Sequence, residues 1–212
     1  MNKELKVFVV GPATYYAKWI NDSIIVDNPE EADIIMFTGG EDVDPSLYNA
    51  EKHIYTGSNI ERDLRELAIF EKYPRKFKLG ICRGSQLMCV ANGGKLVQDC
   101  NNHAIGGTHK ITFDNGAILP ITSTHHQMAY PFNLKEGEDY ELVAVSTEKL
   151  STYYDMDNAT VENLENEPEI TWYPKTNTFA IQGHPQMMDN NSDTVIYLNE
   201  VLRTYLKEAY GE

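Results

Sequence analysis

Apolar runs and polar turns alternate along the first half of the chain and predict strands and helices in turn. Residues 5–10, 34–37 and 77–81 are short and almost continuously apolar, which is typical of buried strands. A short helix over 14–20 and a brief strand over 24–26 are expected between the first two runs. This order predicts a mainly parallel sheet with right-handed crossovers and flanking helices.

Residues 60–73 follow a helical pattern. Ser58 or Asn59 can cap this helix, and Pro74 ends it. Apolar residues recur at steps of three and four, so we expect one face to lie on the core: Ile60, Leu64, Leu67 and Ala68. We expect the charged residues between them to face solvent: Arg62, Asp63, Arg65 and Glu66.

After residue 99 the pattern changes to strands joined by tight turns. Asp114-Asn115-Gly116 lies between two apolar segments and is a strong hairpin signal. Further strands are expected at 142–145, 160–164, 170–173 and 178–182, and an amphipathic helix over 192–209. These pieces predict a small, partly antiparallel β layer added to the main sheet.

Composition narrows the class of protein. A chain of 212 residues with 42% hydrophobic content fits a single domain over 1–212. The 18 basic and 32 acidic residues give a net charge of −14, which argues against nucleic-acid binding. Neither a signal peptide nor a membrane-length apolar run is visible, and three cysteines form no disulfide framework. We therefore expect a cytoplasmic protein without membrane association.

The segment Gly80-Ile81-Cys82-Arg83-Gly84 carries the clearest chemical signal. It lies between the predicted strand 77–81 and a predicted helix over 85–92, and it is the cysteine form of the nucleophile elbow G-x-S-x-G. Glycines on both sides of Cys82 allow the strand and helix to approach closely. The helix N-terminus is expected to lower the thiol pKa. On these five residues alone, a buried core cysteine in an ordinary turn remains the alternative.

Gly39 and Gly40 follow the predicted strand 34–37. Paired glycines at a strand end allow backbone N–H groups to turn toward a ligand, although an ordinary turn uses the same residues. The carboxyl ends of parallel strands meet at one edge of a sheet. We therefore expect Gly39, Gly40 and Cys82 to be neighbours.

Six separate motifs occur along the chain in order: residues 38–45, Arg62-Asp63, residues 80–84, Gly93-Gly94 with Gln98-Asp99, residues 123–127, and Gly183-His184-Pro185. This combination resembles class I glutamine-amidotransferase-like proteins. It is most similar to the peptidase C26 branch, which includes γ-glutamyl-γ-aminobutyrate hydrolases and γ-glutamyl hydrolases. The resemblance spans about residues 34 to 188 and implies a flavodoxin-like α/β fold that needs no metal or organic cofactor.

The resemblance implies a catalytic role for Cys82. Its thiolate would attack the side-chain carbonyl of a γ-glutamyl amide and form a thioester that water hydrolyses. His184 would take the thiol proton and return it to the leaving amine or ammonia. The Arg83 backbone N–H, with a second N–H from Gly39 or Gly40, would form the oxyanion hole.

One position departs from the family pattern. The family usually has His-Pro-Glu, and this chain has His184-Pro185-Gln186. Gln186 can accept a hydrogen bond from the imidazole through its amide oxygen, but it supplies no charge. Neutral amides serve in cysteine enzymes of the Cys-His-Asn type. We therefore expect a weaker thiolate–imidazolium pair, with Gln186 kept in the catalytic set.

The segment Ser123-Thr124-His125-His126-Gln127 is expected beside the substrate. Adjacent histidines on a strand point to opposite faces, so joint chelation of a metal by His125 and His126 is not expected. The resemblance implies that Ser123, His126 or Gln127 contacts the glutamyl portion of the substrate. Gln86, one turn into the elbow helix, is expected near the same pocket.

Three functions are compatible with these residues. The first is a free hydrolase of glutamine or γ-glutamyl amines. The second is a glutaminase subunit that passes ammonia to a separate synthase. The third is a binding or regulatory homologue, weakened in catalysis because Gln186 replaces the usual glutamate. The sequence leaves the leaving amine and the oligomeric state open.

Overall fold

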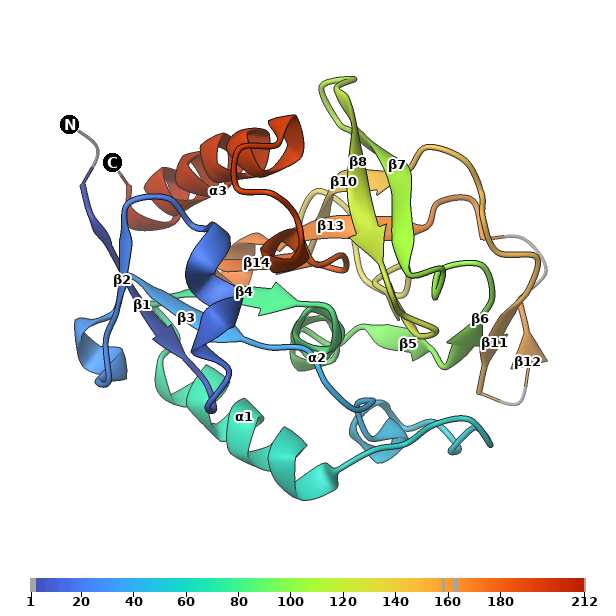
Figure 1. Cartoon of the computed structure of the whole chain (residues 1–212). Helices are drawn as coiled ribbons and strands as arrows, with labels where there is room; N and C mark the ends of the chain where they lie inside the picture. The colour runs from blue at the N-terminus through green and yellow to red at the C-terminus, as the bar shows by residue number, and fades with distance from the viewer. Residues whose placement is uncertain (1–2, 158, 162–163, 212) are drawn as a thin grey trace.

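A sheet of nine strands organises the described residues of the computed structural model, which are 3–157, 159–161 and 164–211. Its strand order is β2-β1-β3-β4-β14-β13-β10-β7-β8 (Figure 1). The bounds are β1 Leu5–Val9, β2 Ser23–Ile25, β3 Ile34–Phe37, β4 Phe77–Ile81, β7 Gly107–Phe113, β8 Ile118–Ser123, β10 Glu141–Ser146, β13 Pro168–Tyr173 and β14 Thr178–Ile181.

Strands β2, β1, β3, β4 and β14 form the parallel half that the apolar runs predict. Both faces of its inner strands β3, β4 and β14 are covered, which is why these runs are almost continuously apolar rather than alternating. In β3, Ile34 and Met36 pack on one side of the sheet, and Ile35 and Phe37 pack on the other. The expected α/β class with a mainly parallel sheet is therefore confirmed.

Helices cover both faces of the parallel half. Figure 1 shows α3 (Asp193–Tyr210) on one side of the sheet and α1 (Ile60–Lys72) with α2 (Arg83–Ala91) on the other. Asn59 caps α1 by accepting the Arg62 N–H at 3.2 Å, as one of the two expected caps. The expected short helix over 14–20 is a 3-10 helix, Thr14–Trp19, that packs in the same core cluster as α3.

The predicted inner and outer faces of α1 are wrong at several positions, although Leu67 packs against the core and Arg65 is exposed as expected. Asp63 and Glu66 are buried, whereas Leu64 is 54% exposed. The reason is Arg83, whose guanidinium is only 1% exposed and forms ion pairs with both buried carboxylates. A buried guanidinium requires carboxylate partners, and this requirement overrides the apolar stripe of α1.

The antiparallel strands extend the main sheet and are joined by two small sheets. Strands β13, β10, β7 and β8 are antiparallel, and β7–β8 is the predicted hairpin. The small sheets are β12-β11-β6 and β5-β9, with β5 Lys95–Val97, β6 Asp99–Cys100, β9 Met128–Tyr130, β11 Tyr154–Met156 and β12 Ala159–Thr160. Of the strand expected at 160–164, positions 162–163 lie outside the described residues.

Among the helices of the described residues, none combines the length and the apolar character that crossing a membrane requires.

Candidate functional site at the carboxyl edge of the sheet

Cys82 lies on a sharp turn between β4 and α2. Its backbone has φ 54° and ψ −113°, a strained conformation for a residue with a side chain. A Cβ added at Gly80 would lie 2.6 Å from the Gly84 carbonyl oxygen, and one at Gly84 would overlap the Phe37 carbonyl. The two glycines therefore allow the close strand–helix approach expected from the elbow pattern.

The expected low pKa of the Cys82 thiol is wrong. Burial raises its pKa to about 12, and the Asp42 and Glu169 carboxylates contribute in the same direction. The Arg83 backbone N–H at the start of α2 opposes this rise but does not overcome it. Cys82 is therefore a neutral thiol when no ligand is bound, because desolvation outweighs the helix N-terminus.

His184 reaches the same edge of the sheet as Cys82. Strand β14 is the parallel neighbour of β4, with Ile181 paired to Ile81. The segments that follow these two strands therefore leave the sheet side by side. The His184 backbone is held by Thr122, whose hydroxyl accepts the His184 N–H at 2.9 Å and donates to its carbonyl at 2.8 Å. Burial lowers the pKa of His184, so its imidazole is neutral at pH 7.

Gln186 contacts His184 directly. The Gln186 Nε2 atom lies 2.8 Å from His184 Nδ1, and both side chains are buried. The Gln186 Oε1 atom is buried without a hydrogen-bond partner among the described residues. A half-turn of the amide would place Oε1 against Nδ1, where it would accept the ring N–H. The two side chains are therefore in contact, with the amide nitrogen rather than the expected oxygen against the ring.

Gly39 lies beside His184, and Gly40 lies against Arg62. A Cβ added at Gly39 would lie 3.5 Å from His184 Cε1 and 2.5 Å from the Tyr16 hydroxyl oxygen. The Arg62 guanidinium donates to the Gly39 carbonyl at 3.0 Å. Because N–H and C=O of a trans peptide point in opposite directions, the Gly40 N–H is turned away from Arg62.

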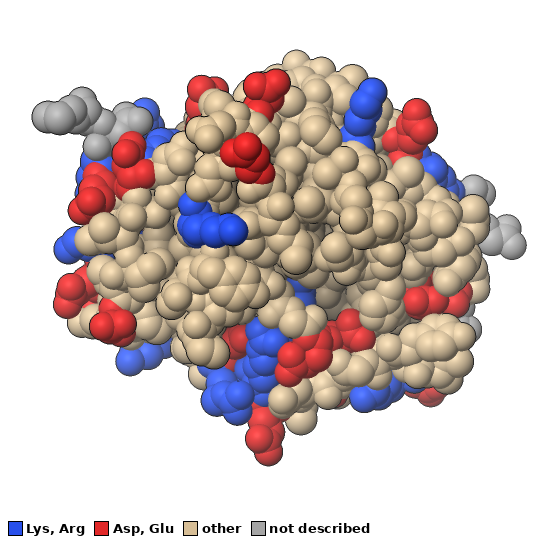
Figure 2. All heavy atoms as spheres, viewed as in Figure 1, with Lys and Arg blue, Asp and Glu red and all other residues tan. Residues whose placement is uncertain are grey.

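Arg62, which holds the turn at Gly39 and Gly40, is itself fixed by ion pairs. Arg62 Nε and Nη1 each lie 2.8 Å from a carboxylate, of Glu66 and Glu41 respectively. Figure 2 shows basic and acidic side chains interleaved at the lower edge of the molecule, over α1. Glu66 also pairs with Arg83, so one network joins α1, the glycine turn and the first residue of the elbow helix.

The four predicted substrate residues differ in access. His126 keeps 38% of its side chain exposed and lies 3.2 Å from both Asp42 and Asp99. Hydrogen bonding to Asp42 raises the pKa of His126 despite partial burial. The other three are buried: Gln86 donates to the Gln127 carbonyl, Ser123 to the His103 carbonyl, and Gln127 to the Thr56 hydroxyl.

His125 and His126 point to opposite sides, as expected for neighbours in an extended chain. The His125 ring is buried against His103, whereas His126 faces Asp42 and Asp99. Joint chelation by the two adjacent histidines is therefore excluded by the geometry.

Three residues beside Cys82 or His184 were not among the predicted site residues. Tyr16 lies against Gly39, and burial with the nearby Tyr15 and Cys82 raises its pKa to about 12. Thr122 holds the His184 backbone. Asp42 follows the paired glycines closely, which is the only sequence signal among the three.

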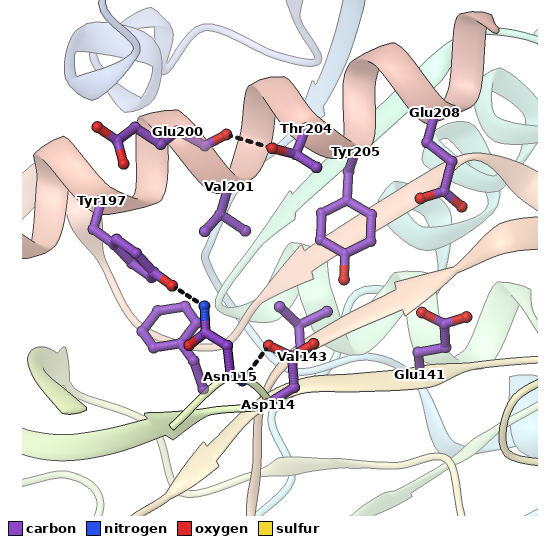
Figure 3. Close-up of a pocket in the computed structure, with 11 residues that line it drawn as sticks. Asp114, Asn115, Glu141, Val143, Tyr197, Glu200, Val201, Thr204, Tyr205 and Glu208 are labelled. Atoms are coloured by element: carbon purple, nitrogen blue, oxygen red, sulfur yellow. Dashed lines mark hydrogen bonds between the residues drawn. The ribbon is translucent and has the colours of Figure 1, made fainter. Parts of the chain in front are cut away.

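A separate surface hollow lies between α3 and the β7–β10 region. It encloses about 350 Å³, and Figure 3 shows Asp114, Glu141, Glu200 and Glu208 around it. The Tyr197 hydroxyl accepts a hydrogen bond from Asn115 at 2.6 Å across its mouth. The eleven described residues that line it include no cysteine or histidine, so it lacks the nucleophile–base chemistry of the elbow.

Solved structures share this fold over nearly the whole chain. A protein from Thermoplasma acidophilum, described as a "putative GMP synthase" component, matches with a TM-score of 0.59 and 19% identity, covering 100% of this chain and 96% of that one. A glutamine amidotransferase from Thermotoga maritima matches with a TM-score of 0.56 and 14% identity, covering 99% and 97%. At these identities the two structures show that the fold is shared.

Sequence comparison identifies the family. Protein NtpR of Enterococcus hirae is 23% identical over 183 residues, which cover 78% of this chain and 71% of the relative. The "Putative glutamine amidotransferase-like protein YvdE" of Lactococcus lactis subsp. lactis is 29% identical over 162 residues, covering 66% and 67%. The family model Peptidase C26 matches residues 19–154. The chain belongs to the peptidase C26 family.

Proposed function

We propose that this protein hydrolyses γ-glutamyl amide bonds, in glutamine or γ-glutamyl amines, with Cys82 as nucleophile and His184 as general base and acid. One observation carries the proposal. Among the cysteines of the described residues, only Cys82 lies on a strained turn, with φ 54°. Cys82 directly follows β4, and the buried His184 follows the neighbouring parallel strand β14. Backbone strain of this kind is retained where surrounding structure enforces it, and it clusters at functional sites.

The resting protonation states determine the order of events. Cys82 is a thiol and His184 a neutral imidazole, so the proton moves from Sγ to the imidazole as sulfur attacks the γ-carbonyl. The imidazolium returns this proton to the departing amine or ammonia, which leaves a γ-glutamyl thioester. Water then attacks the thioester, gives a proton to His184, and releases glutamate and the thiol.

We assign the oxyanion hole to the backbone N–H groups of Arg83 and Gly40. The Arg83 N–H begins α2 directly after Cys82. The Gly40 N–H is turned away from Arg62, because that guanidinium holds the preceding carbonyl. The Gly39 N–H interacts with the Tyr16 hydroxyl, which makes Gly40 the better second donor.

Charges near Cys82 support a substrate with a free α-amino group. Asp42 is close enough to raise the Cys82 pKa and lies 3.2 Å from His126. A γ-glutamyl group carries an α-ammonium and an α-carboxylate, for which Asp42 and a protonated His126 are complementary partners. Gln86, Ser123 and Gln127 then form the buried wall behind this pair rather than its contact surface.

A glutaminase subunit is the second candidate. The match to a protein described as part of a GMP synthase supports this interpretation only at the level of the fold. If ammonia is passed to a synthase, hydrolysis by the isolated chain is slow and rises when the partner is added. A binding homologue without turnover is the third candidate, and its only support is Gln186 in place of glutamate.

Product release tests the proposal directly. Purified wild type and Cys82→Ala are incubated with glutamine and a panel of γ-glutamyl amines, and glutamate and amine are quantified. We expect release by wild type only, with an acid-stable mass increase of one γ-glutamyl group on the Cys82 peptide. Absence of release, together with no labelling of Cys82 by a glutamine-like electrophile, would sink the hydrolase assignment.

A further inference from the structure

A buried cluster of imidazoles and carboxylates lies beside the candidate active site and has no part in the proposed reaction. His103, His125 and Glu169 bring one ligand atom each to within 4.8 Å of one another. All three are at most 4% exposed. They come from the loop after β6, the loop after β8, and β13, so the fold rather than a local motif assembles them.

Several polar atoms of this cluster lack hydrogen-bond partners among the described residues. They are His103 Nδ1, His125 Nε2 and Glu169 Oε2, whereas His103 Nε2 and Glu169 Oε1 are paired with Glu167 and His109. A buried polar atom that makes no hydrogen bond destabilises the fold, because it has lost its water without a replacement. Three such atoms around one point, one from each residue, indicate that the site is built for a group that they bind together.

Each candidate ligand also has an outer neighbour that orients it. The His125 Nδ1 lies 2.8 Å from the Gln127 carbonyl, which requires a proton on Nδ1 and leaves a lone pair on Nε2. The His103 Nε2 lies 3.2 Å from Glu167, which directs the other ring nitrogen toward Glu169 at 3.7 Å. The Glu169 Oε1 lies 2.8 Å from His109 Nε2.

This pattern of inner lone pairs and outer acceptors is typical of metal-binding histidines, whose second nitrogen is held by a carboxylate or a carbonyl. We propose that His103 Nδ1, His125 Nε2 and the Glu169 carboxylate bind one zinc ion. Two imidazoles and one carboxylate are a zinc-type ligand set. The divalent charge also offsets the two buried carboxylates of Glu167 and Glu169.

The three ligand atoms lie close enough together to bind a tetrahedral zinc ion after small movements. Zinc bonds of about 2.0–2.1 Å place neighbouring ligand atoms about 3.3 Å apart, so the ligand atoms would close by up to about 1.5 Å. Small rotations of the three side chains supply this movement. The fourth position would hold a water molecule.

The role we assign to this zinc is to order the substrate loop. His125 lies directly before His126, and the Gln127 carbonyl that holds His125 also accepts a hydrogen bond from Gln86 of the elbow helix at 2.9 Å. Glu169 lies one residue before the Ile170–Ile181 pair of β13 and β14. The ion would therefore tie the loop at 124–127 to the strands that support Cys82 and His184, without touching the reacting atoms.

Metal titration of the full chain tests the site independently of any hydrolase activity. Protein stripped with a chelator is titrated with Zn²⁺ or Co²⁺ while bound metal, the visible spectrum and the melting temperature are recorded. We expect one equivalent, the intense visible bands of tetrahedral Co²⁺, no sulfur-to-cobalt charge-transfer band, and a higher melting temperature. Glu169→Gln should weaken the metal at least a hundredfold, and Glu167→Gln about 10- to 100-fold.

The matched control is His126→Asn, because His126 is the neighbour of a ligand but faces the opposite side. This variant should bind metal like wild type. Folded wild type that binds less than a tenth of an equivalent would overturn the proposal. So would cobalt bands with a sulfur charge-transfer component that survive in Glu169→Gln and disappear in Cys82→Ser or Cys100→Ser. The wild-type spectrum gives an answer even if a buried variant does not fold.

Discussion

Gln186→Glu is the most informative substitution, because it restores the charge that the family pattern usually places beside the histidine. Gln186 is buried and lies 2.8 Å from His184 Nδ1, so the new carboxylate would contact the imidazole in a site of low polarity. It would accept the Nδ1–H and leave Nε2 free to take the thiol proton. It would also stabilise the imidazolium that forms when sulfur attacks.

The size of the effect follows from this single contact. A hydrogen bond to a charged group contributes about 1.5–3 kcal/mol, against about 0.5–1.5 kcal/mol for a neutral pair. The midpoints of these ranges differ by about 1.2 kcal/mol, which corresponds to an increase of about eightfold in kcat/KM. The carboxylate also raises the pKa of His184, so the acid limb of the pH–rate profile moves to higher pH.

The assay compares wild type, Gln186→Glu and Gln186→Met on one γ-glutamyl amine across pH 5–9, with urea unfolding of each variant as the control for stability. Gln186→Met removes any hydrogen bond and should lose activity. A fall of more than tenfold in kcat/KM for Gln186→Glu, in protein that unfolds like wild type, would refute the reasoning. It would mean that the amide itself performs a step that a carboxylate cannot.

Three further predictions follow from the elbow and its supports. Gly84→Ala forces a methyl group against a strand carbonyl and should lower the free energy of unfolding by about 1–3 kcal/mol in urea titration, whereas a change within error would contradict the close packing. Arg83→Met leaves Asp63 buried without a cation, while Glu66 keeps Arg62, and should cost about 3–5 kcal/mol, part of which the second change Asp63→Asn restores. Because burial raises the pKa of Cys82 to about 12, its alkylation by iodoacetamide, followed on the Cys82 peptide by mass spectrometry, should rise up to pH 10 without a plateau. A plateau near pH 7 would instead indicate a preformed thiolate.

The parallel half of the fold could be predicted because its inner strands β3, β4 and β14 are buried on both faces and so appear as almost continuous apolar runs. The expected strand 34–37 and the observed β3 have the same bounds. The elbow was predictable from a local pattern: Gly80 is required by its contact with Gly84 four residues on, although Gly84 itself is required by Phe37 of the neighbouring strand β3.

The charged face of α1 could not be predicted, because its burial depends on a residue in another element. Asp63 and Glu66 are inside only because Arg83 enters the interior from the start of α2. The predicted direction of the Cys82 pKa shift was wrong for the same reason, because it also depends on contacts with other elements. The helix N-terminus is visible in the sequence, whereas the depth of burial that outweighs it is set by the folded chain.

The cluster of His103, His125 and Glu169 could not be predicted for a third reason. Its members stand far apart in the sequence, in two loops and one strand, without a local spacing that indicates metal ligands. The sequence predicted only that His125 and His126 face opposite sides. This agrees with the structure, in which His125 is buried and His126 is partly exposed.

The hold of Thr122 on His184 has a consequence for how this protein would fail on heating. Strand β8, which carries Thr122, is the outermost strand of the antiparallel half. The Thr122 hydroxyl nevertheless forms hydrogen bonds with both the N–H and the carbonyl of His184. Edge hairpins open at a lower free-energy cost than a buried parallel core. Brief fraying of β7–β8 would release the histidine while the elbow and its strained cysteine stay intact. The upper working temperature would then be governed by the outermost hairpin and would lie below the midpoint of global melting.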